Sequence, residues 1–554
     1  TPDPGTHLLR FCGDSLVLRL TLAQAPPEGA QAFVRTNVGR ARVQMREVIA
    51  DVDEDRPRPH ADWHDLEMPR VSETAYELTL PFPQPGFFQA KAFLPPAPDT
   101  DPVWPDGDNL FLHVQPAAYA AANGLYNAFV RQFGHTSGST PPDETDEAAA
   151  RKLEEKGYAA IPPSGTFRDL VAHLDTIIDR LGFRILQVLP IFPTPTVYAR
   201  MGRYGSPFAP TDFTSVDPAL VEFDRRSTPL DQFRELIDAV HARGGRLVLD
   251  IPLNHTGWGS TLQTHHPDWF PRDPDGSFRS PGAWGVTWED LTELSYRDRE
   301  AWRAAADILL FWCGEGVDGF RCDAGYMIPL PVWEYLTARV RLQFPDTLFL
   351  LEGLGGKLET TEALLGPGGM NWAYSELFQT ETREQSDAYL PYAQTVSRER
   401  GLLLNFAETH DNNRLAARGH RYARMRTAFA ALFSPCGAFA ITNGVEWFAD
   451  AKLDVHGAAP IRWGETPNQI DPLRRLNALL DTHPCFHPDA EQRLVHRNRG
   501  PALALLRTAR QPAGIRKLLA LVNLDPDHPA KARWSIAEFA TEGEDVLDLV
   551  SGDT

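Results

Sequence analysis

The chain of 554 residues is too long for one compact core, so we expect two or three domains, one of them large. With 42% hydrophobic and 23% charged residues, its composition is typical of a folded globular protein and excludes a disordered or fibrous one. The formal net charge of −20 argues against a nucleic-acid partner, because binding to phosphates requires clustered Lys and Arg side chains.

The first hundred-odd residues show the two-residue alternation of β-strands. Residues 76–80 and 88–92 place apolar side chains at every second position, and the turn Pro85-Gly86 separates the two runs. A Pro-rich and Asp-rich stretch then precedes a last apolar run at 110–114. The pattern predicts an N-terminal β-sandwich over residues 1–118.

From Tyr126 the pattern changes to short apolar runs that alternate with amphipathic helices, as in βα units. The helix expected from Thr228 has Pro229 at its first position and ends at Gly244-Gly245, and the segment 166–182 repeats this design. Eight such strands complete a barrel. The predicted strands are 126–131, 185–189, 246–251, 317–322, 347–351, 371–374, 402–407 and 438–442. We therefore predict an α/β fold, a (β/α)8 TIM barrel over residues 119–487 with a short insertion at about 256–296.

After about residue 488 the short-strand pattern returns. Runs at 502–506, 518–522 and 546–549 are separated by Asp-Pro and Gly turns and predict a small C-terminal β domain over residues 488–554. Three strands are few for a closed sandwich, so the sequence leaves open whether the natural chain is longer.

Cysteine usage and hydropathy bear on location. The five cysteines are scattered and show no paired spacing, which favours a reducing, cytoplasmic location. No apolar stretch approaches the roughly 20 residues of a membrane span, so no membrane partner is expected. The oligomeric state is not readable from the sequence.

Polar residues stand where the predicted barrel strands end, which is where such barrels carry their active sites. Strand three ends in 250–255 (DIPLNH), strand four in 319–324 (GFRCDA), strand five in 349–353 (FLLEG), strand seven leads into 408–414 (ETHDNNR), and 205–213 (GSPFAPTDF) follows strand two.

These five blocks, in this order, resemble the ordered motifs of the α-amylase family, glycoside hydrolase family 13, over roughly residues 126–447. Carried over by position, the resemblance implies Asp323 as the nucleophile and Glu352 as the acid/base. It implies Asp411 as a third carboxylate that binds sugar hydroxyls. The motif Gly444-Val445-Glu446 matches a segment that is usually structural in the family.

The resemblance also implies a set of substrate-binding residues. In the −1 subsite, His255 and His410 donate hydrogen bonds to the sugar, and Asp212 and Arg414 support the subsite. The full set is Phe208, Asp212, His255, Arg321, Tyr326, His410 and Arg414.

Two positions depart from the family pattern. Phe208 replaces the usual stacking Tyr, which keeps the ring and removes a hydroxyl. Tyr326 and Met327 replace a Lys-His pair, which predicts an apolar, adaptable +1 side and argues against simple endo-amylase specificity.

The chemistry of glycoside cleavage explains these residue types. A retaining enzyme places two carboxyl groups about 5 to 5.5 Å apart, one to attack the anomeric carbon and one to protonate the leaving oxygen. Arg321 lies two residues before Asp323 and therefore on the same strand face, where its charge favours an ionised nucleophile. Glu352 follows the apolar run 349–351 and has no basic neighbour in sequence, which favours a protonated acid.

No metal or other cofactor is predicted. The resemblance offers Asn254 as a calcium ligand, but the segment 256–296 shows no oxygen-rich cage. His265 and His266 are adjacent and point in different directions, as in a solvated loop. Asp250 is interpreted as a structural residue whose side chain points into the barrel.

The main hypothesis is a retaining hydrolase or transglycosylase that cleaves α-1,4 bonds in maltodextrin or glycogen-like α-glucans. Alternatives are a 4-α-glucanotransferase of glycogen-debranching type and a phosphate-using maltosyltransferase, since residues 266–277 and the N-terminal sandwich are similar to those members. A basic pocket near the carboxylates would mark phosphate use. A non-catalytic glucan-binding protein is a weaker hypothesis, because all three carboxylates are present. A metal-dependent barrel hydrolase is also weaker, because it needs a cluster of histidines and only His255 and His410 stand at strand ends.

Overall fold

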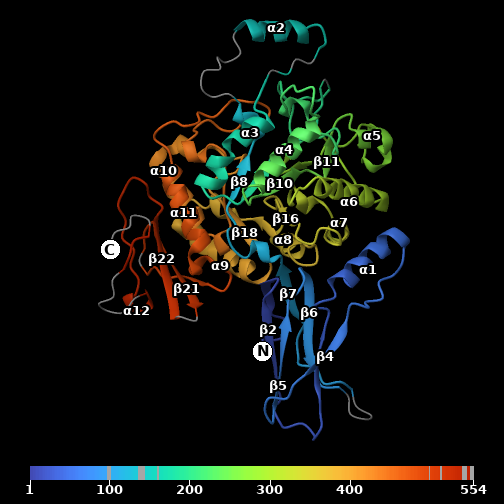
Figure 1. Cartoon of the computed structure of the whole chain (residues 1–554), viewed down its shortest axis with the longest axis vertical. Coiled ribbons are helices and arrows are strands. Elements are labelled where there is room, and N and C mark those ends of the chain that lie inside the picture. Colours follow the sequence, from blue (N-terminus) through green and yellow to red (C-terminus); the bar gives the residue numbers. More distant parts are fainter. Residues whose placement is uncertain are drawn as a thin grey trace.

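The computed structural model describes residues 1–95, 101–134, 144–158, 161, 163–196, 198–497, 499–511, 514–539 and 546–549. A central barrel carries an N-terminal pair of sheets at its base and a C-terminal sheet on its flank (Figure 1). Helix α2 (Glu144–Glu154) projects from the opposite end of the barrel. Among the described helices, none has both the length and the apolar content that crossing a membrane requires.

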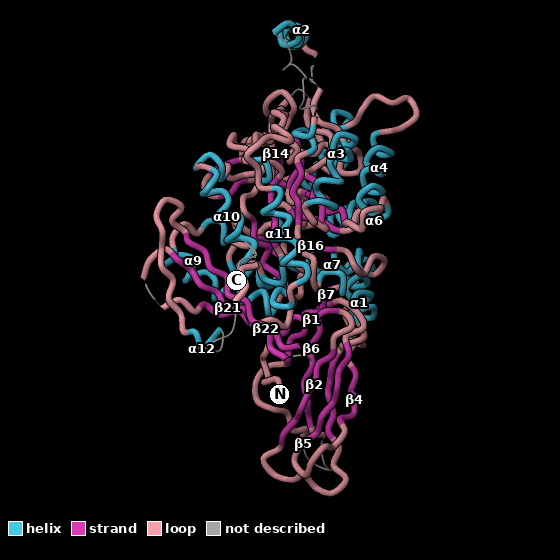
Figure 2. The backbone as a smooth tube through the Cα atoms, turned by 60° about the vertical axis from the view of Figure 1, so that its left-hand side comes forward, coloured by secondary structure: helices cyan, strands magenta, loops and turns pink. Residues whose placement is uncertain are grey.

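The N-terminal region packs a five-stranded sheet, in the order β1-β7-β6-β3-β4, against the two-stranded sheet β2-β5 (Figure 2). Leu18 and Leu80 of the small sheet share one apolar cluster with Val34 and Leu112 of the large sheet. The predicted sandwich is thus present with uneven layers. Its strands are β1 (His7–Phe11), β2 (Ser15–Thr21), β3 (Ala32–Thr36), β4 (His64–Met68), β5 (Ala75–Pro81), β6 (Gly86–Phe93) and β7 (Leu110–Gln115).

Helix α1 (Ala41–Glu54) interrupts these strands and was not predicted. It buries Val48 and Val52, which are four residues apart and therefore lie on one helix face. Both belong to the apolar cluster of the barrel, so the helix connects the N-terminal sheets to the barrel base.

The barrel is closed by eight parallel strands whose order follows the chain. All eight predicted strands are confirmed, with ends that differ by a few residues. They are β8 (Leu125–Ala128), β9 (Ile185–Val188), β10 (Arg246–Ile251), β15 (Gly319–Cys322), β16 (Leu348–Leu351), β17 (Trp372–Tyr374), β18 (Leu402–Phe406) and β19 (Phe439–Thr442). The (β/α)8 fold follows.

Helices cover the outside of the barrel. Capping boxes start three of them. Those of Thr166 with Asp169 and Thr228 with Asp231 are as the sequence predicts, and Thr382 with Gln385 forms the third. The helix predicted at 166–182 is α-helical only as far as Leu174 and continues as a wider π-helical turn. The larger helices are α3 (Phe167–Leu174), α4 (Pro229–His241), α6 (Arg299–Gly314), α7 (Leu330–Arg341), α8 (Leu358–Leu364), α9 (Arg383–Glu399), α10 (His420–Leu432) and α11 (Ile470–Thr482).

A segment inserted after β10 forms its own small structure. Strand β11 (His255–Gly257) pairs antiparallel with β14 (Leu291–Glu293), and this pairing closes the base of the insertion. Between them lie α5 (Thr261–His265) and the hairpin of β12 (Gly282–Ala283) and β13 (Val286–Thr287).

The C-terminal sheet has the order β20-β21-β22, with β20 (Glu491–Leu494), β21 (Ala502–Gln511) and β22 (Gly514–Asn523). The strands predicted at 502–506 and 518–522 are confirmed as parts of β21 and β22, and β20 was missed. The strand predicted at 546–549 is wrong, because these residues are exposed and have no regular structure. The short helix α12 (Ile536–Phe539) follows β22.

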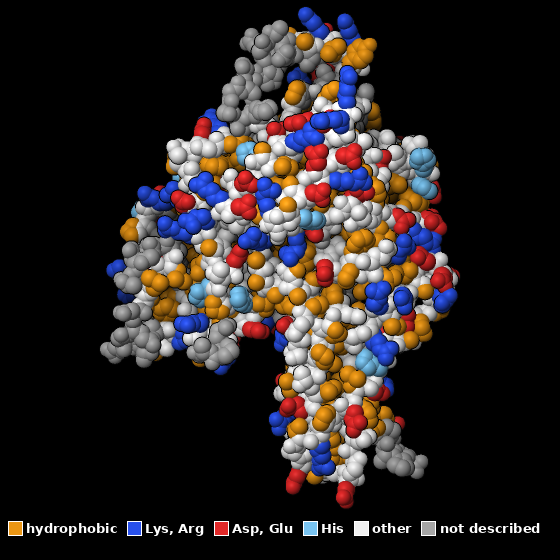
Figure 3. All heavy atoms as spheres, viewed as in Figure 1, with side chains coloured by type: hydrophobic (Ala, Val, Ile, Leu, Met, Phe, Trp, Pro, Cys, Tyr) orange, Lys and Arg blue, Asp and Glu red, His pale blue; other side chains and the backbone are white. Residues whose placement is uncertain are grey.

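Acidic and basic side chains are interspersed over the face seen in Figure 3 rather than gathered by sign.

A buried polar pair closes the barrel between its last and first strands. Glu446 is completely buried and accepts hydrogen bonds from the Tyr126 hydroxyl on β8 and from the Gly444 amide. Burial raises the pKa of Glu446 to about 7, and the two hydrogen bonds oppose that shift. The segment Gly444–Glu446 is therefore structural in this protein.

We expect Glu446→Gln to flatten the pH dependence of stability. The folded protein binds the Glu446 proton more tightly than the unfolded chain does, and this tighter binding adds to the free energy of unfolding. The contribution is complete below about pH 4.5 and is lost as the pH rises through about 7. Over that window it amounts to on the order of 3 kcal/mol. Urea unfolding at pH 5 and pH 8 measures the effect. The exposed carboxyl variant Glu491→Gln should keep the wild-type slope, and an unchanged slope in Glu446→Gln would contradict the assignment.

Candidate active site

The candidate site lies at the carboxyl ends of neighbouring barrel strands. Asp323 directly follows β15, and its amide donates to Ile251 O at the end of β10, 3.2 Å away. Glu352 directly follows β16, and its amide donates to Cys322 O at 3.1 Å. The barrel hydrogen bonding therefore sets the two carboxyl-bearing residues side by side.

Arg321 bridges two carboxylates. Its Nη1 lies 2.5 Å from Asp323 Oδ1 and 2.9 Å from Asp250 Oδ1. Arg321 and Asp250 are 2% and 0% exposed, whereas Asp323 is 17% exposed. Asp250 thus holds the guanidinium from below while Asp323 remains open to solvent, so Asp250 is a positioning residue, as its sequence position suggests.

Glu352 occupies a different environment. Its side chain is buried and accepts hydrogen bonds from the amides of Ala324 at 3.0 Å and Leu354 at 2.9 Å. Burial raises the pKa of Glu352, the negative charge of Asp323 raises it further, and Arg321 with the two amides opposes the shift. Glu352 therefore keeps its proton to a higher pH than an ordinary Glu.

Aromatic and imidazole rings line one side of the site. Phe208 stacks on His410 with ring centroids 5.4 Å apart and planes 14° apart. His255 Nε2 lies 2.8 Å from Phe208 O, and its Nδ1 is buried without a partner among the described residues. Burial lowers the pKa of both histidines, which favours neutral rings. Asp411 lies 3.3 Å from His410 Nε2 and is 71% exposed.

Tyr326 lies beside the two carboxyl groups, in the short helical turn Gly325–Met327 after Asp323. Burial and the charges of Glu352 and Asp323 raise the pKa of Tyr326 to about 12. Its ring rests on Gly355 and Gly356, because a Cβ at Gly355 would lie 2.0 Å from the Tyr326 oxygen. These glycines are functional candidates that sequence reasoning missed, although a Gly-Gly pair just after a strand end is a usable signal.

The two residues predicted to support the −1 subsite, Asp212 and Arg414, form contacts with neighbouring side chains and amides of the chain. Asp212 accepts hydrogen bonds from Thr214 and Ser215, which is a turn-capping arrangement. Arg414 pairs with Glu408 at 2.8 Å, and both side chains are almost completely buried.

Met327 does not define an apolar +1 side by its recorded contacts. Its sulfur accepts a hydrogen bond from Asn254 Nδ2 at 3.2 Å, so the side chain lies against the end of strand three.

The barrel floor below Arg321 contains polar residues that the sequence analysis did not single out. The ring of Tyr374, the last residue of β17, lies 5.3 Å from the Arg321 guanidinium. Gln187 of β9 donates to Asp250 at 3.5 Å, and Asn127 of β8 approaches His410 at 3.4 Å. Each is polar within an otherwise apolar strand, which is the signal that could have found them.

A group of side chains that could ligate a metal ion lies outside the barrel. Within the described residues, Glu47, His60 and Asp62 of the N-terminal region form such a group. Glu47 already accepts hydrogen bonds from the amides of His60 and Ala61. His265 is the exposed last residue of α5, and His266 is half-buried and stacks on Trp269 at 3.9 Å, so the solvated loop expected for this pair is not what forms.

The barrel is closed and parallel, and adjacent strand ends carry an ion-paired carboxylate and a buried carboxyl group that favours its protonated form. These features define a class of protein, the barrel enzymes that work with paired carboxyl groups. Sequence comparison is consistent with this class. Residues 128–348 match the profile "Alpha amylase, catalytic domain". This stretch, which is less than half of the chain, therefore resembles the catalytic domain of the α-amylase family.

Curated relatives include two bacterial proteins named alpha-1,4-glucan:maltose-1-phosphate maltosyltransferase. The protein from Burkholderia pseudomallei is 28% identical over 415 residues, which cover 69% of this chain and 35% of the relative. The protein from Cereibacter sphaeroides is 28% identical over 426 residues, which cover 70% of this chain and 61% of the relative. The chain thus spans less than two thirds of the length of these relatives.

Solved structures share the fold. An alpha-amylase from Lactobacillus plantarum superposes with a TM-score of 0.58 at 24% identity and covers 73% of this chain and 89% of its own. A debranching enzyme from Nostoc punctiforme gives 0.55 at 18% identity and covers 74% and 90%.

The buried pair of Arg414 and Glu408 predicts a stability role for Arg414. We expect Arg414→Met to lower the free energy of unfolding by about 3–5 kcal/mol, because it leaves Glu408 buried and unpaired. Arg462→Met, which removes an ion pair with side chains 84% and 58% exposed, should cost less than about 1 kcal/mol. Chemical denaturation compares the two. Unchanged stability together with a raised KM would contradict the stability role and would instead support a role of Arg414 in substrate binding.

Proposed function

We propose that the protein cleaves and remakes α-1,4-glucosidic bonds with retention of configuration, with Asp323 as the nucleophile and Glu352 as the acid/base. The observation that carries this proposal is the contrast between neighbouring carboxyl groups. Arg321 pairs with Asp323, while burial favours the protonated form of Glu352. Two carboxyl groups in opposite protonation states are what a double-displacement reaction requires.

The proposed reaction has two steps. Asp323 attacks the anomeric carbon while Glu352 gives its proton to the departing glycosidic oxygen, which leaves a glycosyl ester on Asp323. Glu352, now ionised, takes a proton from the acceptor as the acceptor oxygen attacks the anomeric carbon and releases Asp323. Arg321 remains bound to Asp250 throughout, so the guanidinium is in place when the Asp323 carboxylate returns.

The remaining residues are proposed to hold a glucose ring. Phe208 offers an aromatic face, and His255 and His410 offer neutral ring nitrogens for sugar hydroxyls. Asp411 is mostly exposed and is free to turn toward vicinal hydroxyl groups.

The names of the relatives favour maltosyl transfer that uses a sugar phosphate over simple hydrolysis. We therefore propose maltose 1-phosphate and an α-1,4-glucan as the substrate pair. A phosphate group requires a cation that carboxylates have not neutralised, and Arg321 and Arg414 are both paired. Lys357 follows the glycine turn beneath Tyr326, is exposed, and has no recorded ion pair within the described residues. It is the proposed phosphate contact.

Asp323→Asn and Glu352→Gln are each expected to lower kcat by about 10³-fold or more, because they remove the nucleophile or the proton donor. Release and transfer of maltooligosaccharides measure the effect, and circular dichroism checks the fold. Asp275→Asn, at an exposed turn of the insertion, is the matched control and should keep wild-type turnover. Wild-type rates in either carboxyl variant would refute the assigned roles.

Product analysis with maltoheptaose, with and without inorganic phosphate, is expected to show maltose 1-phosphate only when phosphate is present. Lys357→Met should raise the KM for phosphate at least about tenfold, as loss of one charged hydrogen bond implies. Lys517→Met, at an exposed position on β22 of the C-terminal sheet, is the control and should not. Short reducing sugars formed equally in both conditions would favour hydrolysis, and longer chains without phosphate would favour 4-α-glucan transfer.

A further inference from the structure

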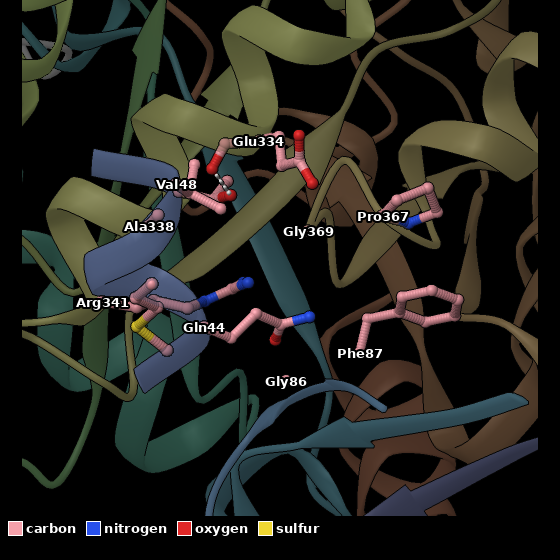
Figure 4. Close-up of a pocket in the computed structure, with 11 residues that line it drawn as sticks. Gln44, Val48, Gly86, Phe87, Glu334, Ala338, Arg341, Pro367 and Gly369 are labelled. Atoms are coloured by element: carbon pink, nitrogen blue, oxygen red, sulfur yellow. Dashed lines mark hydrogen bonds between the residues drawn. The ribbon is translucent and has the colours of Figure 1, made fainter. Parts of the chain in front are cut away.

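A small, partly open space lies between the N-terminal sheets and the base of the barrel (Figure 4). It consists of two adjoining cavities of about 70 and 20 Å³ that share Gly86, Phe87, Arg341 and Gly369. About 10–15 Å³ of such volume admits one water molecule, so this space accommodates a small ion together with water. Asn371, which precedes strand β17, also lines it, so the space lies at the amino end of the barrel, opposite Asp323 and Glu352.

Arg341 is the cation in this space. Its side chain is only 7% exposed, and Nη2 donates to Asn371 Oδ1 at 2.6 Å. Nε is buried without a hydrogen-bond partner among the described residues, and no acceptor is recorded there for Nη1, which lies over the backbone of Gly369. One neutral amide oxygen is therefore the recorded acceptor of this guanidinium.

Other buried arginines of the chain are better compensated. Arg321 and Arg414 pair with carboxylates. Arg426 donates to three backbone carbonyls, those of Leu377, Phe378 and Thr380, and Arg507 donates to those of Leu432, Ser434 and Cys485. Burial lowers the pKa of Arg341 to about 10, so its guanidinium is still charged at neutral pH. The ring of Phe349 lies 5.2 Å from the central carbon of the Arg341 guanidinium, but no carboxylate among the described residues pairs with it. A buried cation without a counter-charge is costly.

The lining of the space indicates what compensates that charge. Val48, Phe87, Ala338 and Pro367 give it apolar walls. Gln44 extends into the same space as Arg341 and offers a second donor (Figure 4). Glu334 also lines it, but both its oxygens accept from Arg58 at 3.0 Å, which neutralises that carboxylate. Arg400 and His113 line the smaller cavity, but Arg400 pairs with Glu362 at 3.1 Å and burial lowers the pKa of His113, which favours a neutral ring. The one unpaired positive charge, few donors and apolar walls suit a small, weakly hydrated monovalent anion rather than a phosphate, which needs more donors.

We infer that this space is a halide site, in which chloride binds between Arg341 on α7 and Gln44 on α1. The anion would link the N-terminal region to the barrel, because the lining comes from α1 and β6 on one side and from α7 and the loop before β17 on the other. This inference does not depend on the proposed activity.

The test uses the full chain. In crystals soaked in sodium bromide, an anomalous peak is expected within hydrogen-bond distance of the Arg341 guanidinium. In solution, chloride or bromide should raise the Tm saturably, by about 2 °C or more, relative to sodium gluconate at the same ionic strength. Ala338→Leu fills the cavity and keeps Arg341, so it should remove the halide response, as should Arg341→Met.

Arg339→Met is the matched control, since Arg339 lies on the same helix and pairs with Asp53 and Asp307. It should retain the halide response. If Arg341→Met does not fold, the bromide peak in wild-type crystals and the halide response of Ala338→Leu still test the inference. The inference is overturned by the absence of a bromide peak at this position, or by equal Tm values in halide and gluconate. A peak accompanied by the same halide response in wild type and Ala338→Leu would mean an adventitious ion only, and would also overturn it.

Discussion

The candidate site depends on one buried guanidinium shared by two carboxylates. Arg321 is held from below by Asp250 and presents the same Nη1 to Asp323. The rings of Phe208 and Tyr374 flank it, 5.8 and 5.3 Å from its central carbon. Removing one partner of a buried ion pair is costly, so the position of Asp323 is tied to the barrel interior. Because Arg321 is already engaged, Glu352 lies without a cation of its own, and burial then dominates its protonation.

Acidic side chains at the top of this barrel therefore differ in behaviour although their chemistry is nearly the same. Glu352 receives two backbone hydrogen bonds in a buried setting, Asp411 is largely exposed, and Glu408 is fixed by Arg414. Environment rather than residue type separates a buried carboxyl group, an exposed carboxylate and a structural ion pair. The proposed division of labour in catalysis rests on that separation.

Buried arginines also connect the barrel to its neighbouring regions. Arg507 of β21 donates to the carbonyls of Leu432 and Ser434, which attaches the C-terminal sheet to the barrel. Arg341 lies where the N-terminal region meets the barrel base, with far fewer acceptors. Ion pairs of Asp51 and Asp53 with Arg299, Arg303 and Arg339 also hold this junction. The proposed halide would add the counter-charge that Arg341 itself lacks.

The sequence by itself determined the barrel, because alternating apolar runs and helix caps are local patterns, and all eight strands follow from them. It also placed Asp323 and Glu352 at adjacent strand ends, since that follows from strand order alone. Tertiary structure decided the rest. Asp212 caps a turn, Arg414 pairs with Glu408, Tyr326 is held by distant glycines, and residues 546–549 form no strand. Such outcomes depend on partners far away in the chain, and no local pattern of residues records which acceptor a buried side chain will find.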